Sequence, residues 1–157
     1  MQTISDIAWI ACGINREDGK RTVPLLWDNL LLYFAMERGV YLFDPKKNIL
    51  NEVIDEDIRS RIPDQNFAKK APVILLLGLD DSDLSQMTEA VLTDGGGVTL
   101  YSGMQIAYAS QSIYLYAAAN NLNTVALGWF DQVFLKEKLE SSEKTNFFLA
   151  HPIGYNE

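Results

Sequence analysis

A twelve-residue stretch of mixed charge is the part of this sequence that is best equipped to bind a ligand. It covers residues 13–24, reads GINREDGKRTVP, and lies between the apolar runs DIAWIAC and LLWDNLLLYF. Its cations would converge on one anion if the chain doubles back at Asp18-Gly19, a strong turn pair, and phosphate groups are usually met by such cations. The alternative is a solvated turn in which the neighbouring acids neutralise these cations, which are Arg16, Lys20 and Arg21.

Other side chains offer little for catalysis or metal binding. His151 is the only histidine and precedes a proline in a predicted strand, so a structural role is favoured over that of a general base. No serine lies in the G-x-S-x-G context of a nucleophile elbow. One histidine and one cysteine cannot build a structural zinc site. We therefore assign no catalytic residue and no metal ligand.

Two further segments have both a functional and a structural interpretation. The acidic run 80–83 could hold calcium, but it lacks the twelve-residue ligand spacing with its closing glutamate, so a solvated helix start is favoured. The glycines at 95–97 could form a phosphate nest before a helix, but no P-loop pattern follows, so a flexible loop is favoured.

Length and composition limit the class of protein. The 157 residues fit a single domain, 1–157, and 48% of them are hydrophobic, which is enough for a core. The net charge of −8 argues against nucleic acid as a partner. No run is apolar and long enough for a membrane span, and no signal peptide is visible, so we expect a cytoplasmic protein. Cys12 lies in an apolar run, where a buried, inert thiol is expected.

Apolar periodicity and turn residues predict the elements of the first half of the chain. A short helix is expected over residues 5–12, with Gly13 ending it in the left-handed region. Residues 30–36 and 40–43 should form a β-hairpin, and residues 49–54 a third strand. A helix is expected over residues 55–62, because acids open it, as the helix dipole favours, and Pro63 follows it.

In the second half, the unbroken apolar run 73–79 predicts a strand that is covered on both faces. Its tail, DDSDLSQ, could start a helix. The longest helix should span residues 100–120, followed by a strand at 124–127, a helix at 131–139 and a final strand at 146–153. Pro152 favours an edge or terminal position for that last strand. Together these elements predict the α+β class, built around a mixed sheet.

The long helix also predicts an assembly. Its apolar and small residues cover most of its circumference, and a helix that is apolar all round is usually buried on all sides. One protomer of this length has limited interior for that, so we expect a symmetric dimer with this helix near the twofold axis. The alternative is a central core helix in a monomer.

Four segments in a fixed order resemble the FMN-dependent nitroreductase family. They are WIACGINREDGKRTVP, GVYLFDPKKNIL, ASQSIYLYAAANNLNTVALGWFD and LAHPIGY, and the resemblance extends from Ile7 to Tyr155. It is strongest to the branch with SagB-type dehydrogenases and similar bacterial proteins. It implies a central sheet flanked by helices, an obligate homodimer, and FMN at the dimer interface. It further implies that NAD(P)H reduces the flavin, which a small electron-accepting substrate then reoxidises in ping-pong fashion.

The resemblance also implies which residues contact the cofactor. Arg16 matches the end of a GxNR segment, and Gln111 matches the first member of a Gln-Asn pair on the long helix. The loop that approaches the flavin ring, where backbone amides can serve the N5 edge, is matched by Leu127, Gly128 and Trp129. The start of the family's R-T-x-P-S loop is matched by Arg21, Thr22 and Pro24. With Lys20 from the charged stretch and Asn29 from the segment that follows, these are the candidate FMN contacts.

The sequence departs from the family in three places. The arginine-rich R-R-S-x-R segment that binds the FMN phosphate is not among these residues, the P-S-A/G loop is replaced by residues 24–29, and Ser112 replaces the Asn of the helix pair. Either Arg16, Lys20 and Arg21 replace the missing phosphate contacts, or the fold has lost its cofactor and serves a structural or binding role. Lys46 and Lys144 are expected to be distant surface charges without effect on binding.

Overall fold

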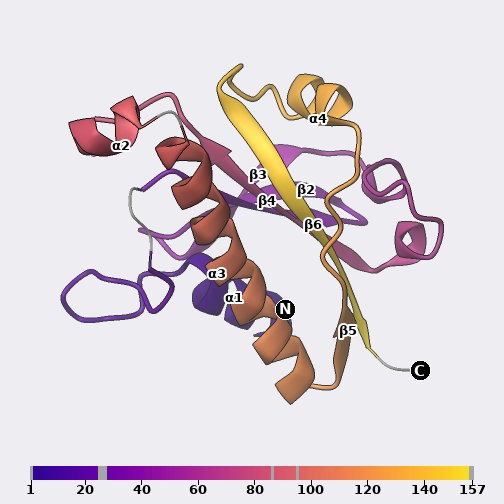
Figure 1. Cartoon of the computed structure of the whole chain (residues 1–157). Coiled ribbons are helices and arrows are strands. Elements are labelled where there is room, and N and C mark those ends of the chain that lie inside the picture. The colour runs from indigo at the N-terminus through magenta and orange to yellow at the C-terminus, as the bar shows by residue number, and fades with distance from the viewer. Residues whose placement is uncertain (1, 25–27, 86, 95, 156–157) are drawn as a thin grey trace.

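A six-stranded sheet forms the centre of the protein, seen here in a computed structural model that describes residues 2–24, 28–85, 87–94 and 96–155 (Figure 1). The strand order is β3-β2-β1-β4-β6-β5. This confirms the α+β class. The pairings of the described strands are all antiparallel, so the expectation of a mixed sheet is wrong, because β4 enters beside β1 in the opposite direction after the segment 55–72. The strands are β1 (Leu30–Met36), β2 (Gly39–Asp44), β3 (Ile49–Ile54), β4 (Val73–Asp80), β5 (Leu122–Thr124) and β6 (Thr145–Tyr155).

Helices cover both faces of this sheet. On one face, α1 (Gln2–Cys12) and the long α3 (Gly97–Ala119) pack side by side, as Figure 1 shows. On the other face lie two single 3₁₀ turns, η1 (Arg59–Arg61) and η2 (Ala68–Lys70), and the short helix α4 (Gln132–Lys138). The remaining helix, α2 (Glu89–Thr93), precedes α3.

Strand β4 is buried on both faces, as its unbroken apolar run predicted. Leu75, Leu77 and Leu79 point into the core beneath α1 and α3. Ile74 and Leu76 point into the second core, beneath η1, η2 and α4. The alternation of the side chains along one strand thus supplies both cores.

The hairpin β1–β2 and the strand β3 lie where the sequence predicted them. Gly39 is required at the turn, since its φ is +139° and a Cβ there would lie 2.2 Å from the carbonyl oxygen of Ile54. Gly13 ends α1 as expected but is not in the left-handed region, so that expectation is wrong. Its N–H instead continues the helical pattern by donating to Trp9 O at 3.0 Å, and a Cβ would lie 2.6 Å from that oxygen.

The two acid-rich segments do not form the predicted helices. Over residues 55–62 only η1 is helical, because Asp57 accepts hydrogen bonds from the backbone and the guanidinium of Arg59. At 80–85, Asp80 and Asp83 accept from the backbone N–H two residues later, at 3.0 and 2.9 Å. Short acidic side chains that bind nearby backbone groups compete with helix formation.

Two boundaries in the second half also moved. The strand expected at 124–127 is β5, which begins two residues earlier and ends three residues earlier, and Leu127 instead forms an isolated bridge with Ala150. Pro152 lies in β6, next to the edge strand β5 rather than at the edge itself. Among the described helices, none combines the length and the apolar character that crossing a membrane would need.

Candidate functional site

The charged loop 13–24 is a closed turn held at its base. Gly19 N–H donates to Arg16 O at 3.0 Å, and Gly19 has a φ of +78°, so the chain does double back at Asp18-Gly19. At the base, the side-chain oxygen of Asn15 accepts from the backbone N–H and the hydroxyl of Thr22, at 2.8 and 3.2 Å. The loop thus leaves α1 and returns to the sheet at a fixed point.

The three cations of this loop have different surroundings. Lys20 pairs with Asp18 at 2.8 Å, both largely exposed, and the hydrogen bond from Lys20 lowers the pKa of Asp18. Arg21 is almost buried, with 11% of its side chain exposed, and pairs with Asp28 at 2.8 Å. Arg16 is exposed at the tip of the loop. Two of the three cations therefore already have an anionic partner, and they do not converge on one point.

A cavity of about 400 Å³ lies where this loop meets the two helices of its face. Apolar side chains from α1 and α3 form most of it, and Thr22 of the loop and Ser112 of α3 lie on the same lining. Thr22 was matched to the R-T-x-P-S loop by resemblance, whereas Ser112 stands where the family has the Asn of the helix pair, so the cavity joins the loop to this turn of α3. The complete lining is Trp9, Ile10, Asn15, Thr22, Ser112, Leu115 and Tyr116.

The other candidates near this face are placed less directly. Gln111 is exposed on α3, next to Ser112 in sequence. Pro24 is exposed, and the three residues that follow it lie outside the described part of the chain. Asn29 is buried and linked to two other elements: it accepts from Gln105 at 3.2 Å and donates to Asp81 at 2.9 Å. Its side chain therefore ties α3 to the end of β4.

The segment 127–129 belongs to the opposite face of the sheet. Leu127 is buried in the core beneath η1, η2 and α4, and its bridge with Ala150 has two hydrogen bonds of 2.8 Å. Gly128 and Trp129 are exposed, and 74% of the Trp129 surface is accessible. Within one chain, this segment and the cavity lined by Thr22 are on different faces.

His151 and Cys12 are both buried, and neither is poised for catalysis. The ring nitrogens of His151 hydrogen-bond with the hydroxyls of Ser110 and Thr124, at 2.9 and 3.2 Å, and burial lowers its pKa to about 4. Burial raises the pKa of Cys12 to about 11, so its thiol stays protonated. No group of three or more potential metal ligands occurs among the described residues.

Comparison with known proteins supports the interpretation of this fold. A candidate nitroreductase of Methanocaldococcus jannaschii is 26% identical over 166 aligned positions, which cover 98% of this chain and 80% of that protein. The crystal structure of a candidate nitroreductase from Ralstonia eutropha superposes with a TM-score of 0.86 at 26% identity, over 99% of this chain and 73% of that one. No family model matches the sequence.

More distant structures share the fold. A candidate NADH oxidase of Clostridium acetobutylicum has a TM-score of 0.64 at 20% identity, over 100% of this chain and 77% of that one. An oxidoreductase described as containing FMN has a TM-score of 0.63 at 13% identity, over 99% of this chain and 67% of that one. The fold and the sequence similarity together confirm the resemblance of this chain to proteins of the nitroreductase family.

Sequence reasoning missed three residues at this site. Trp9 and Asn15 line the cavity, and Lys46 approaches Asp28 to 3.7 Å from the turn between β2 and β3. Trp9 could have been found, since it lies one helical turn before the loop. Lys46 could not, because its contact depends on where the β2–β3 turn folds relative to the loop.

Proposed function

We propose that this chain is the protomer of a cytoplasmic, FMN-dependent oxidoreductase of nitroreductase type. NADH or NADPH would supply electrons, and a small acceptor would receive them in a second, ping-pong step. The observation that carries the proposal is the cavity whose lining joins Thr22 of the loop, a position that resembles the family, to Ser112, which stands at the place of the Asn in the family's helix pair. The similarity to nitroreductases over nearly the whole chain supports it.

The residues of the cavity fit the ring of the cofactor. Trp9, Leu115 and Tyr116 give it apolar and aromatic walls that suit a flat heterocycle, and Asn15 and Thr22 add polar groups. When bound, FMN would supply the hydride chemistry, so the chain needs no acid or base of its own for the transfer. The role of these residues is to orient the ring and to exclude water from one side of it.

A homodimer is part of the proposal. The outer face of α3 is apolar yet open, with Leu100 and Leu115 62% and 63% exposed and Tyr108 38% exposed. A second copy would cover this face. Its segment 127–129 could then lie near the cavity of the first copy, whereas within one chain the segment and the cavity lie on different faces of the sheet. We expect a dimer in sedimentation at micromolar concentration.

The matched test of this interface is Leu115→Glu against Leu92→Glu. Leu92 is similarly exposed, at 47%, but lies on α2 outside the proposed interface. Burying an unpaired carboxylate is costly, so Leu115→Glu should weaken the dimer at least about tenfold, whereas Leu92→Glu should leave it intact. A wild-type protein that sediments as a monomer would contradict the dimer.

The cofactor is tested by absorbance and fluorescence. The protein should bind FMN more tightly than about 100 μM, equivalent to about 5.5 kcal/mol, and NADH or NADPH should bleach the bound flavin without oxygen. Trp9 lines the cavity, so FMN should quench its emission, and Trp9→Phe should remove that component. Absence of flavin absorbance and of saturable quenching at 100 μM would refute the proposal.

The cation that meets the FMN phosphate is tested with riboflavin as the control. Arg21→Ala should weaken FMN at least about tenfold and Arg16→Ala less, because one charge-assisted hydrogen bond contributes about 1.5–3 kcal/mol. Riboflavin lacks the phosphate, so its affinity should hardly change. Equal losses for both ligands would mean that Arg21 only holds the loop.

A second candidate function is a cofactor-free relative with a structural or binding role. The observation that favours it is the pairing of Lys20 with Asp18 and of Arg21 with Asp28, which leaves these cations neutralised within the chain. This candidate predicts no saturable quenching of Trp9 or Trp129 by FMN. The fluorescence titration above therefore separates the two functions.

A further inference from the structure

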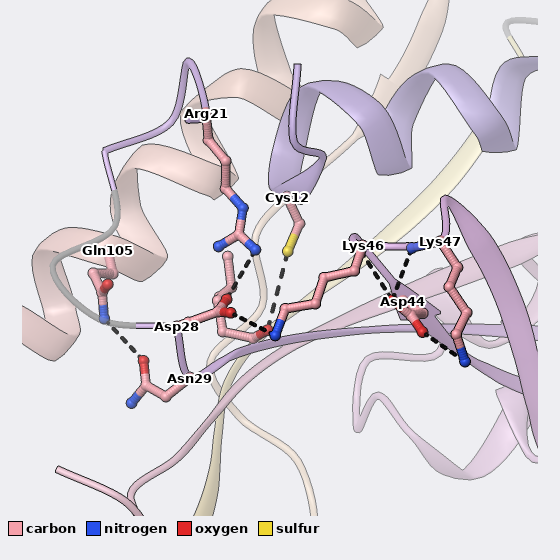
Figure 2. Close-up of polar contacts among 9 residues, drawn as sticks. Cys12, Arg21, Asp28, Asn29, Asp44, Lys46, Lys47 and Gln105 are labelled. Carbon is pink, nitrogen blue, oxygen red and sulfur yellow. Dashed lines mark hydrogen bonds and ion pairs between the residues drawn. The ribbon is translucent and has the colours of Figure 1, made fainter. Parts of the chain in front are cut away.

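The Asp28 carboxylate lies between two cations that come from different parts of the chain (Figure 2). Arg21 of the loop binds one carboxylate oxygen at 2.8 Å, and Lys46 of the β2–β3 turn approaches the other oxygen to 3.7 Å. Each cation thus contacts one oxygen of the carboxylate. Two cations can contact two oxygens of a phosphate group in the same way.

The three side chains of this cluster differ in solvent exposure. Arg21 is 11% exposed, Lys46 is 74% exposed, and Asp28 is 43% exposed between them. The Nε of Arg21 is buried and has no hydrogen-bond partner among the described residues. Asp28 is thus the more exposed member of its pair with Arg21, and displacing this carboxylate would free Nη2 of Arg21 for another acceptor.

We propose that Arg21 and Lys46 form an anion site whose resident occupant is the Asp28 carboxylate, and that a phosphate group competes with Asp28 for it. This inference deepens the proposed function and rests on it where FMN is the ligand. It adds Lys46 to the phosphate contacts and gives Asp28 the role of an internal competitor.

The acidic surroundings explain why the unmodified chain should bind external anions weakly. A cavity of about 250 Å³ next to Asp28 is also lined by Asp80 and Asp83. The charges of Arg21 and Lys46 exceed that of Asp28 by one, but these acids repel a free anion. We expect pyrophosphate to bind the wild-type protein only in the millimolar range, about 4 kcal/mol.

The test is calorimetric titration of pyrophosphate into the whole chain and its variants. Asp28→Asn keeps the shape and removes the charge, so pyrophosphate should bind about tenfold more tightly. Asp64→Asn is the matched control, because it changes the net charge equally at an exposed position away from the site and should change nothing. An unchanged affinity in Asp28→Asn, or an equal gain in Asp64→Asn, overturns the proposal.

Second-site changes identify the cations. In the Asp28→Asn background, Arg21→Ala should abolish the gain, and Lys46→Ala should remove about two- to threefold of it, since the lysine is exposed and screened. A gain that survives Arg21→Ala overturns the assignment. If Asp28→Asn does not fold, arginine side-chain NMR of the wild type decides: pyrophosphate should shift the Arg21 Nε signal but not that of Arg61, which stacks on Phe134. A stationary Arg21 signal up to about 10 mM overturns the site.

Ligand pairs separate this inference from the proposed function. If FMN supplies the phosphate, Asp28→Asn should bind FMN more tightly and riboflavin with unchanged affinity. If the nicotinamide cofactor supplies it, Asp28→Asn should bind NADPH more tightly and NADH with unchanged affinity. If no flavin binds either protein, the FMN proposal fails, while the pyrophosphate titration still decides whether Arg21 and Lys46 form an anion site.

Discussion

Two polar clusters join distant segments of this chain, and they differ in charge and in exposure. The cluster around His151 is neutral and buried, and links β6 to Ser110 of α3 and Thr124 of β5. The cluster around Asp28 is charged and half exposed, and links the loop 13–24 to the β2–β3 turn. The first has no exchangeable partner and serves stability. The second can exchange its carboxylate for an anion from solution.

The largest effect should come from removing the neutral cluster. His151→Ala takes the partner from the buried hydroxyl of Ser110 and the partly buried hydroxyl of Thr124 and opens a cavity, so we expect a loss of about 3 kcal/mol in the free energy of unfolding. Tyr114, whose ring packs edge-on against His151 at 5.3 Å, loses that contact too. Urea denaturation measures the loss, and Thr124→Val, which removes one hydrogen bond only, should cost about 1 kcal/mol. A loss below 1 kcal/mol for His151→Ala would contradict this role.

A nearly equal effect should follow from protonating the same histidine. The pKa of His151 is lowered from 6.5 to about 4 in the folded protein, so the unfolded chain binds the proton first as the pH falls. Its contribution to stability is complete above pH 6.5 and is lost as the pH falls to 4, by about 3 kcal/mol. Because carboxylates also titrate there, the measurement is the difference between wild type and His151→Asn at pH 7 and pH 4.5. An equal difference in the free energy of unfolding at the two pH values would rule out this titration.

The charged cluster should contribute least to stability and respond most to salt. A double-mutant cycle of Arg21→Ala and Asp28→Asn should give a coupling of about 0.5–1 kcal/mol at low ionic strength. At 1 M salt, where the Debye length is about 3 Å, the coupling should fall by at least about half. Two matched cycles in the neutral cluster pair His151→Ala with Ser110→Ala and with Thr124→Val. Their coupling energies should be insensitive to salt. Equal salt dependence in the charged and the neutral cluster would remove the distinction between them.

Much of the fold could be predicted because apolar periodicity encodes it directly. The strand β4, the hairpin β1–β2 and the long helix α3 each carry a pattern that burial alone explains. The helix expected at 55–62 failed for a reason that periodicity does not contain. There, the Asp57 side chain takes the backbone N–H of Arg59 and bends the chain locally.

The site was less predictable, because its contacts depend on the packing of separate segments. Cations on one short loop suggested a common ligand, yet Arg21 turned inward to Asp28 while Arg16 stayed at the tip. Lys46 was expected to be a distant surface charge, and the fold brings it to within 3.7 Å of the Asp28 carboxylate. Pairings of this kind follow from tertiary structure and not from residue type or spacing.

The closed base of the loop 13–24 has a consequence for cleavage of the chain. Its exposed tip carries Arg16 and Lys20, both trypsin targets, and such tips are preferred sites of proteolytic nicking. A cut there leaves α1 as a separate peptide whose Ile7, Ala8 and Ala11 remain packed in the core. The two fragments should stay associated after digestion and separate only in denaturant, so the protein can be divided into two complementing parts at this turn.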